Sequence, residues 1–89
     1  MSAKFELGRI VITAAAADVL DNRDVEASLV RHRGGDFGEL CDEDRRQNEN
    51  ALVQGLRIFS IYQDRGRRKF YIITEHDRSV TTVLLPEDY

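Results

Sequence analysis

The chain has 89 residues, of which 42% are hydrophobic and 33% are charged, and its formal net charge is −3. These values predict one folded domain spanning residues 1–89, with no room for a cofactor domain plus a substrate domain. The acidic balance argues against strong non-specific DNA binding, which needs a basic surface to neutralise phosphates. The single cysteine, Cys41, excludes an intrachain disulfide and fits a reducing compartment.

The first elements expected along the chain are a strand and a short helix. Residues 5–13 predict a strand, and the β-branched residues Ile10, Val11 and Ile12 are typical of a strand that is well covered on both faces. The alanine-rich segment 14–20 predicts a short helix, with the Thr13 hydroxyl as its N-cap.

Two further helices are predicted in the middle of the chain. Apolar residues at helical spacing indicate a helix at residues 23–32, which glycines 34 and 35 end because glycine adopts the left-handed conformation without a Cβ clash. A third, very polar helix is expected from about 42 to 53, with Asp42 as its cap and Gly55 as its stop. In the loop between these helices, Phe37 and Leu40 are expected to be buried.

The C-terminal third, residues 56–86, predicts a three-stranded antiparallel meander. Side chains alternate between two faces along each strand, turns are expected at residues 64–67 and 76–79, and Pro86 ends the last strand because it lacks an amide hydrogen. Apolar residues occupy both faces, so both faces are expected to be at least partly covered. The sequence therefore predicts an α+β fold: an N-terminal strand, two to three helices, then the meander, with about four strands in one sheet.

Several runs of residues resemble those of one family. They are Arg31-His32, residues 35–40 with Asp36 among them, Asp44 with Asn48, Ala51-Leu52, and residues 73–86. Together they resemble a family of small bacterial proteins labelled plasmid-related proteins or, misleadingly, type I restriction system modification subunits. Phe37 stands where the family usually has Trp, and His76 where it has a small residue. Because the family has no established activity, the resemblance implies association with plasmids or other mobile elements rather than a mechanism.

The restriction label can be tested on chemical grounds. An adenine methyltransferase needs a cofactor pocket at a doubly wound sheet and a Pro-Pro-aromatic motif that holds the flipped base. This chain has a single proline, Pro86, and no glycine-rich turn from strand to helix. We therefore exclude methyl transfer, and we expect no cofactor.

Six polar residues are candidates for binding a ligand or partner. Asp77, Arg78 and Thr82 lie in or near the second turn of the meander, where a structural role is favoured and recognition is the main alternative. The remaining candidates are His32, Asp36 and Asn48. The spacing of His32, Asp36 and Cys41 matches no standard zinc pattern, so no metal site is predicted. The acidic neighbours of Cys41 argue against a reactive thiolate, and a buried or half-buried structural thiol is expected.

Two other hypotheses remain open. A ribonuclease of the barnase or RelE type would need acid–base groups and cations for the phosphate; the chain offers His32, His76, Glu75, Arg67, Arg68, Lys69 and Arg78. A cleft in which a histidine meets one of these arginines would support it. The second hypothesis is an acidic inhibitor that imitates nucleic acid, because residues 36–44 hold five carboxylates, although capping and solubility explain most of them.

The leading hypothesis is a small soluble accessory or interaction protein carried on mobile DNA, with no catalytic activity expected. Its expected partner is another protein or, as a weak homo-oligomer, a second copy; contact of residues 67–69 with nucleic acid is left open. Residues 1–6 lack the apolar region of a signal peptide, and the apolar run 11–17 is too short to span a bilayer. No membrane association and a cytoplasmic location are therefore expected.

Overall fold

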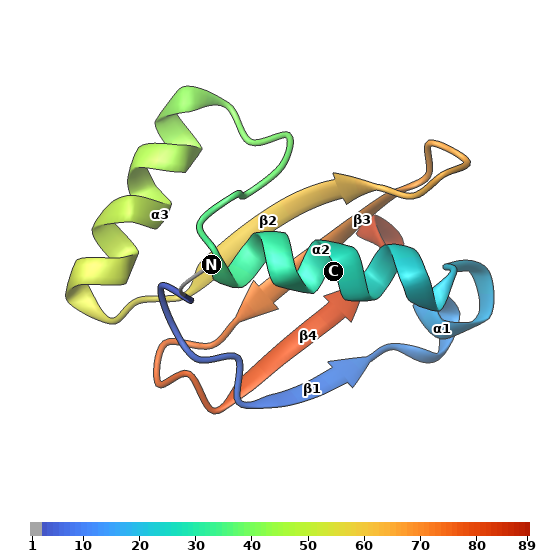
Figure 1. Ribbon diagram of the computed structural model, residues 1–89, viewed down its shortest axis with the longest axis horizontal. Coiled ribbons are helices and arrows are strands. Elements are labelled where there is room, and N and C mark those ends of the chain that lie inside the picture. The colour runs from blue at the N-terminus through green and yellow to red at the C-terminus, as the bar shows by residue number, and fades with distance from the viewer. Residues whose placement is uncertain (1–2) are drawn as a thin grey trace.

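The computed structural model describes residues 3–89. Its strands are β1 (Arg9–Ile12), β2 (Ile58–Gln63), β3 (Lys69–Thr74) and β4 (Val80–Leu84), and they form one sheet in the order β1-β4-β3-β2. Strands β2, β3 and β4 form the predicted antiparallel meander, and β1 lies parallel to β4 (Figure 1). The helices α1 (Ala14–Val19), α2 (Asn22–Arg33) and α3 (Asp42–Gln54) separate β1 from β2, and the 3-10 helix η1 (Pro86–Asp88) follows β4. The predicted α+β fold is confirmed.

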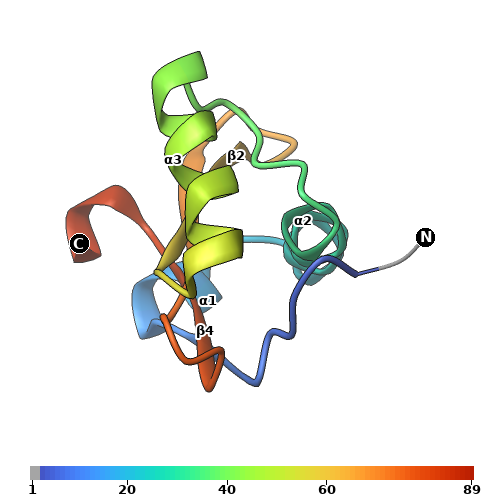
Figure 2. The same ribbon diagram turned by 90° about the vertical axis from the view of Figure 1, so that its left-hand side faces the viewer.

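The sheet has two faces with different surroundings. Helix α2 lies across one face, which we call the covered face, and η1 lies on the opposite side, which we call the open face (Figure 2). On the covered face, residues of α1, α2 and the loop between them pack on Tyr62, Phe70, Ile72 and Val83 to form the main core. Helix α3 stands beside β2 at one edge of the sheet (Figure 1). No helix within residues 3–89 is long and apolar enough to cross a membrane.

Strand β1 differs from its sequence-based prediction in length and in cover. It spans only Arg9–Ile12, and it lies at the edge of the sheet with Ile10 50% and Val11 39% exposed. The prediction of a well-covered strand is wrong because apolar composition does not reveal which strand lies at an edge. The strand begins after Gly8, whose φ of +64° turns the chain where a Cβ would lie 2.3 Å from the Ser79 carbonyl oxygen.

The ends of the helices follow mostly from local chemistry. Thr13 caps α1 as predicted, because its Oγ1 accepts a hydrogen bond from the Ala16 amide at 3.2 Å. Gly55, with φ +68°, ends α3 as predicted. Pro86 begins η1, and only Leu85 separates it from the end of β4, in agreement with the prediction that the last strand ends at this proline.

The start of α3 corrects two predictions. Its N-cap residue is Cys41, and Asp42 is the first residue of the helix itself. Cys41 is exposed, rather than buried or half-buried as predicted. Both corrections follow from one arrangement: Phe37 and Leu40 are the buried anchors of this loop, as predicted, and the chain leaves the core directly after Leu40.

The β2 edge of the sheet is closed by side-chain and loop contacts. The Asn48 side-chain amide donates to the Phe59 carbonyl at 2.5 Å and accepts from the Phe59 amide at 3.1 Å, as a neighbouring strand would. Residues 37–39 then satisfy both backbone groups of Ile61, at 3.2 Å and 2.8 Å. Gly38 is required in this contact, because its φ is +74° and a Cβ would lie 1.9 Å from the Ile61 carbonyl oxygen.

Candidate functional site

The most distinctive polar group in the molecule is a buried chain of side chains on the covered face. His32 is fully buried, with Nδ1 2.5 Å from Ser60 Oγ and Nε2 2.8 Å from Thr74 Oγ1. Thr74 Oγ1 lies 2.7 Å from Thr81 Oγ1, which donates to the Leu7 carbonyl oxygen at 2.6 Å. We call these five residues the buried polar chain. It links α2 to three strands of the sheet and to the segment before β1.

The direction of each hydrogen bond in this chain can be assigned. A carbonyl oxygen only accepts, so the Thr81 hydroxyl donates to Leu7 and must itself accept from Thr74. The Thr74 hydroxyl has then used its hydrogen, so it accepts from His32, which carries its proton on Nε2. His32 Nδ1 therefore accepts from Ser60. Every member of the chain is satisfied by a neutral histidine.

The pKa of His32 agrees with this assignment. Burial lowers the pKa of His32 to about 3, and the positive charge of Arg78 contributes in the same direction. The imidazole is therefore neutral at ordinary pH and has no contact with solvent. His32 is placed to hold the fold together rather than to transfer protons to a substrate.

The second turn of the meander is also held by its own polar groups. Asp77 Oδ1 accepts from the Ser79 amide at 3.1 Å and from the Ser79 hydroxyl at 2.5 Å, and these bonds lower the pKa of Asp77. Arg78, with φ +60°, donates to the carbonyl oxygens of Leu56 at 2.5 Å, Ala51 at 3.1 Å and Glu75 at 3.1 Å. Arg78 thereby satisfies backbone carbonyls at and beyond the end of α3. Asp77 and Arg78 both have structural roles.

Of the other candidate residues, Asp36 and Asn48 make structural contacts, whereas Thr82 lies beside a surface hollow. Asp36 pairs with Arg31 at 2.8 Å and accepts from the Gly38 amide, and Arg31 holds the pKa of Asp36 below its ordinary value. Asn48 closes the β2 edge as described above. Thr82 is the exception, because it is half-buried on the open face beside a surface hollow. The structure does not bring the six predicted residues together into one site.

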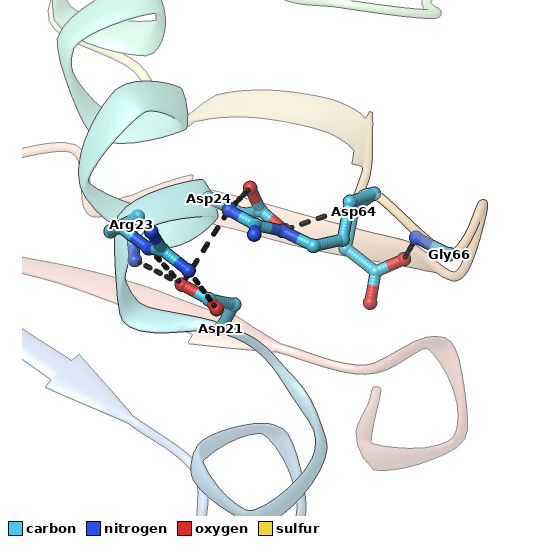
Figure 3. Close-up of polar contacts among 6 residues, drawn as sticks. Asp21, Arg23, Asp24, Asp64 and Gly66 are labelled. Carbon is cyan, nitrogen blue, oxygen red and sulfur yellow. Dashed lines mark hydrogen bonds and ion pairs between the residues drawn. The ribbon is translucent and has the colours of Figure 1, made fainter.

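The basic hairpin between β2 and β3 is partly tied to α2. Arg65 contacts Asp24 through its backbone amide at 3.1 Å and through its guanidinium at 3.0 Å, and it lies 3.8 Å from Asp21. Figure 3 shows Asp21 and Asp24 at the start of α2, facing the hairpin that carries Asp64. Arg68 donates to the Val19 carbonyl at 3.2 Å. Arg65 and Arg68 are therefore already bound within the protein and are less available to contact nucleic acid.

The acidic stretch 36–44 is likewise interrupted by ion pairs. Asp36 pairs with Arg31 as described, and Asp42 pairs with Arg45 at 3.2 Å. In the described part of the chain, no three His, Cys, Asp or Glu side chains group closely enough to hold a metal ion. The carboxylates of this stretch therefore do not form an uninterrupted line of negative charge.

The open face carries an aromatic cluster, formed by Phe59, Tyr71 and Tyr89. The ring centroids of Phe59 and Tyr71 are 4.9 Å apart, and Tyr89 lies 6.3 Å from Phe59 and 6.0 Å from Tyr71. Phe59 and Tyr71 are half-buried, and Tyr89 is 72% exposed. Helix α2 lies on the opposite side of the sheet from η1, the helix that leads to Tyr89 (Figure 2).

Two hollows adjoin this cluster. The first, which we call the η1 hollow, has a volume of about 260 Å³ and is lined by Arg57, Ile73, Glu75, Thr82, Leu84, Asp88 and Tyr89. The second, the α3 hollow, has a volume of about 370 Å³ and is lined by Leu40, Asp44, Gln47, Asn48, Asn50, Ala51, Leu56, Arg57 and Phe59. Arg57 lines both hollows, and it pairs with Glu75 at 3.3 Å between them.

The charges around the two hollows are mostly negative. Asp44, Glu75 and Asp88 supply three carboxylates, whereas Arg57 supplies the single positive charge and is already paired with Glu75. The floor is apolar, with Ile73 and Leu84 in one hollow and Leu40, Ala51 and Leu56 in the other. We regard this combined surface as the candidate functional site.

Sequence reasoning identified only part of this surface. Thr82 and Asn48 were among the predicted residues, whereas Arg57, Phe59, Tyr71 and Tyr89 were not. The available signal was the apolar character of both faces of the meander, which called for a second cover that the chain supplies only in part. A comparison of the chain with protein-family models, with curated proteins and with solved structures found no match.

Proposed function

We propose that the protein is a non-catalytic interaction module that binds an extended segment of another protein across the open face. The observation that carries the proposal is the aromatic cluster flanked by two hollows with apolar floors. Aromatic side chains on a rigid sheet offer large contact areas with little loss of conformational freedom on binding. The hollows on either side would accept individual side chains of the bound segment.

The charge of this surface favours a basic partner segment. Three carboxylates and one guanidinium line the hollows, and because Glu75 and Arg57 pair with each other, Asp44 and Asp88 leave the surface with a net negative charge. Complementary charge supports both the rate and the specificity of association. The partner chemistry that fits is an aromatic or aliphatic residue flanked by Lys or Arg, and a phosphate backbone would be repelled from this face.

The resemblance to plasmid-related proteins favours a protein that is carried on mobile DNA. The single cysteine favours a cytoplasmic location, and we propose that location here.

A ribonuclease is the weaker hypothesis, because His32 is buried in a satisfied hydrogen-bond chain and Arg78 donates its hydrogen bonds to backbone carbonyls. The arrangement leaves neither residue available to a substrate.

The proposal can be tested by selecting ligands from a displayed library of random peptides on the immobilised protein. Enriched peptides should carry a large apolar residue next to Lys or Arg. Glu75→Lys should abolish the selection of basic peptides, because it reverses the charge between the two hollows. Glu26→Lys is the matched control, since Glu26 is exposed on α2 at the opposite side of the sheet, and it should leave the selection unchanged.

Two results would count against the proposal. One is a library that yields no enriched motif, or a motif equally retained by Glu75→Lys. The other is cleavage of a fluorescent single-stranded RNA by the wild-type protein that is lost in a His32→Gln variant whose circular dichroism spectrum matches that of the wild type, which would restore the ribonuclease hypothesis.

A further inference from the structure

The two edges of the sheet differ in whether their outward backbone groups have hydrogen-bond partners. At the β2 edge, Asn48 and residues 37–39 satisfy the outward backbone groups of Phe59 and Ile61. At the β1 edge, no other helix or strand of residues 3–89 lies alongside the strand (Figure 1). Uncovered edges are ready templates for pairing with another strand, and proteins usually block them with charge, proline or cover. Here the edge is left open, and it carries Ile10 and Val11, which are 50% and 39% exposed.

The direction of the unpaired groups on β1 follows from its pairing with β4. The amides of Arg9 and Thr13 donate to the carbonyls of Ser79 and Val83 at 2.9 Å and 3.0 Å, and Val11 pairs between them. Backbone groups alternate in direction along a strand, so those of Ile10 and Ile12 point away from the sheet. These two residues present both N–H and C=O groups at the edge.

We propose that a second copy of this chain pairs with this edge, so that β1 meets β1 of the partner in antiparallel orientation with the two-fold axis at Val11. Ile10 then lies opposite Ile12 of the other copy, and each such pair exchanges both of its hydrogen bonds. Val11 faces its own counterpart across the axis. The same patch serves both copies, as a two-fold symmetric interface requires.

The charges around Val11 fit this symmetry. Two residues before Val11 is Arg9, and two residues after it is Thr13, whose hydroxyl donates to Asp88 Oδ2 at 2.7 Å. Arg9, Val11 and Thr13 project to the same face of the sheet because side chains alternate. Pairing about Val11 sets Arg9 of one copy opposite Thr13 of the other, within reach of that copy's Asp88. The exposed Asp88 carboxylate keeps its second oxygen for this ion pair, which occurs twice about the axis.

This arrangement identifies a second copy as the partner, because a strand of unrelated sequence would not repeat the positive and negative charges at equal distances from Val11. The dimer would join two sheets into one and bring the two open faces side by side. Asp88 also lines the η1 hollow, so the two proposals share this residue. Dimerisation can nevertheless be measured without peptide, and Val11, which lies at the axis, lines neither hollow. Because the strand is short, the interface is small and the association is expected to be weak.

Sedimentation equilibrium of the full chain across the micromolar to millimolar range tests the proposal. The wild-type mass should rise with concentration toward twice that of the monomer. Val11→Lys should remain monomeric, because two like charges would face each other at the axis. Val53→Lys is the control, since Val53 is 86% exposed on α3, far from this edge, and it should dimerise as the wild type does.

A charge exchange tests the ion pair itself. Arg9→Asp should weaken dimerisation by about threefold to tenfold, as expected for two partly exposed ion pairs. The double variant Arg9→Asp, Asp88→Arg should recover the wild-type affinity. The proposal is overturned if the wild type stays monomeric throughout, if Val11→Lys and Val53→Lys dimerise alike, or if the double variant is no stronger than Arg9→Asp. Circular dichroism spectra like that of the wild type confirm that each variant is folded.

Discussion

The covered face and the open face of this sheet use their side chains in opposite ways. On the covered face, Ser60, Thr74 and Thr81 are polar yet fully buried, and with His32 they form a chain in which every group is satisfied. On the open face, Phe59 and Tyr71 are aromatic yet only half-buried. The polar residues that the sequence offers as candidates for catalysis thus stabilise the fold. The aromatic residues that the sequence would place in a core instead form an accessible surface.

The largest expected effect comes from breaking the buried polar chain. His32→Ala should lower the free energy of unfolding by about 4 kcal/mol, because it leaves a cavity and removes the partners of two buried hydroxyls. Urea denaturation at neutral pH measures this change. His76→Ala is the matched control, since His76 is exposed, and it should stay within about 0.5 kcal/mol of the wild type. A loss below about 1 kcal/mol for His32→Ala would mean that the buried polar chain is not important for stability.

A smaller effect is expected from acid alone. The folded-state pKa of His32 is about 3, which is below the ordinary value of 6.5, so the unfolded protein binds the additional proton. The contribution of neutral His32 to stability is therefore fully present above pH 6.5, and this contribution is lost as the pH falls toward 3. Between pH 8 and pH 5 the free energy of unfolding should fall by about 2 kcal/mol, which urea denaturation at each pH would measure.

Asp21, Asp24 and Asp36 do not produce this early loss. The pKa values of Asp21, Asp24 and Asp36 are lowered by bonds to Arg23, Arg65 and Arg31 from an ordinary value of 3.8, so their contribution is lost only at more acidic pH. His76→Gln should keep the loss between pH 8 and pH 5. In nuclear magnetic resonance spectra, the His32 ring should show the neutral form with its proton on Nε2 at pH 5; a ring that titrates near pH 6.5 would contradict the assignment.

Local features of the fold were predictable from the sequence. The cap at Thr13, the stop at Gly55 and the end of the sheet before Pro86 each depend on a few neighbouring residues, whose chemistry acts in any fold. The exposure of β1 was not predictable, because it follows from a strand order that places β4 on one side of β1 and no other strand of residues 3–89 on the other. Ile10 and Val11 would look the same in a central strand.

The candidate site depends even more on contacts between residues that are far apart in the sequence, so it was harder to predict. His32 lies 28 and 42 residues from its partners Ser60 and Thr74, so no local spacing reveals that it is committed to the core. The aromatic cluster likewise forms only when the register of β2 and β3 is set and η1 brings Tyr89 over the sheet. Of the predicted candidates, Thr82 lies on this surface because the alternation of β4 alone assigns its face.

The smallest expected change in stability comes from the open face. Tyr89→Ala should alter the free energy of unfolding by less than about 1 kcal/mol, because the side chain is 72% exposed and little of its surface is removed from water by folding. The same variant should weaken binding of the selected basic peptides by at least tenfold, as expected for an exposed Tyr at the centre of an interface. Urea denaturation and fluorescence titration measure the two quantities. A Tyr89→Ala protein that loses stability while keeping its peptide affinity would show that the aromatic cluster belongs to the core, and the distinction between the two faces would then fail.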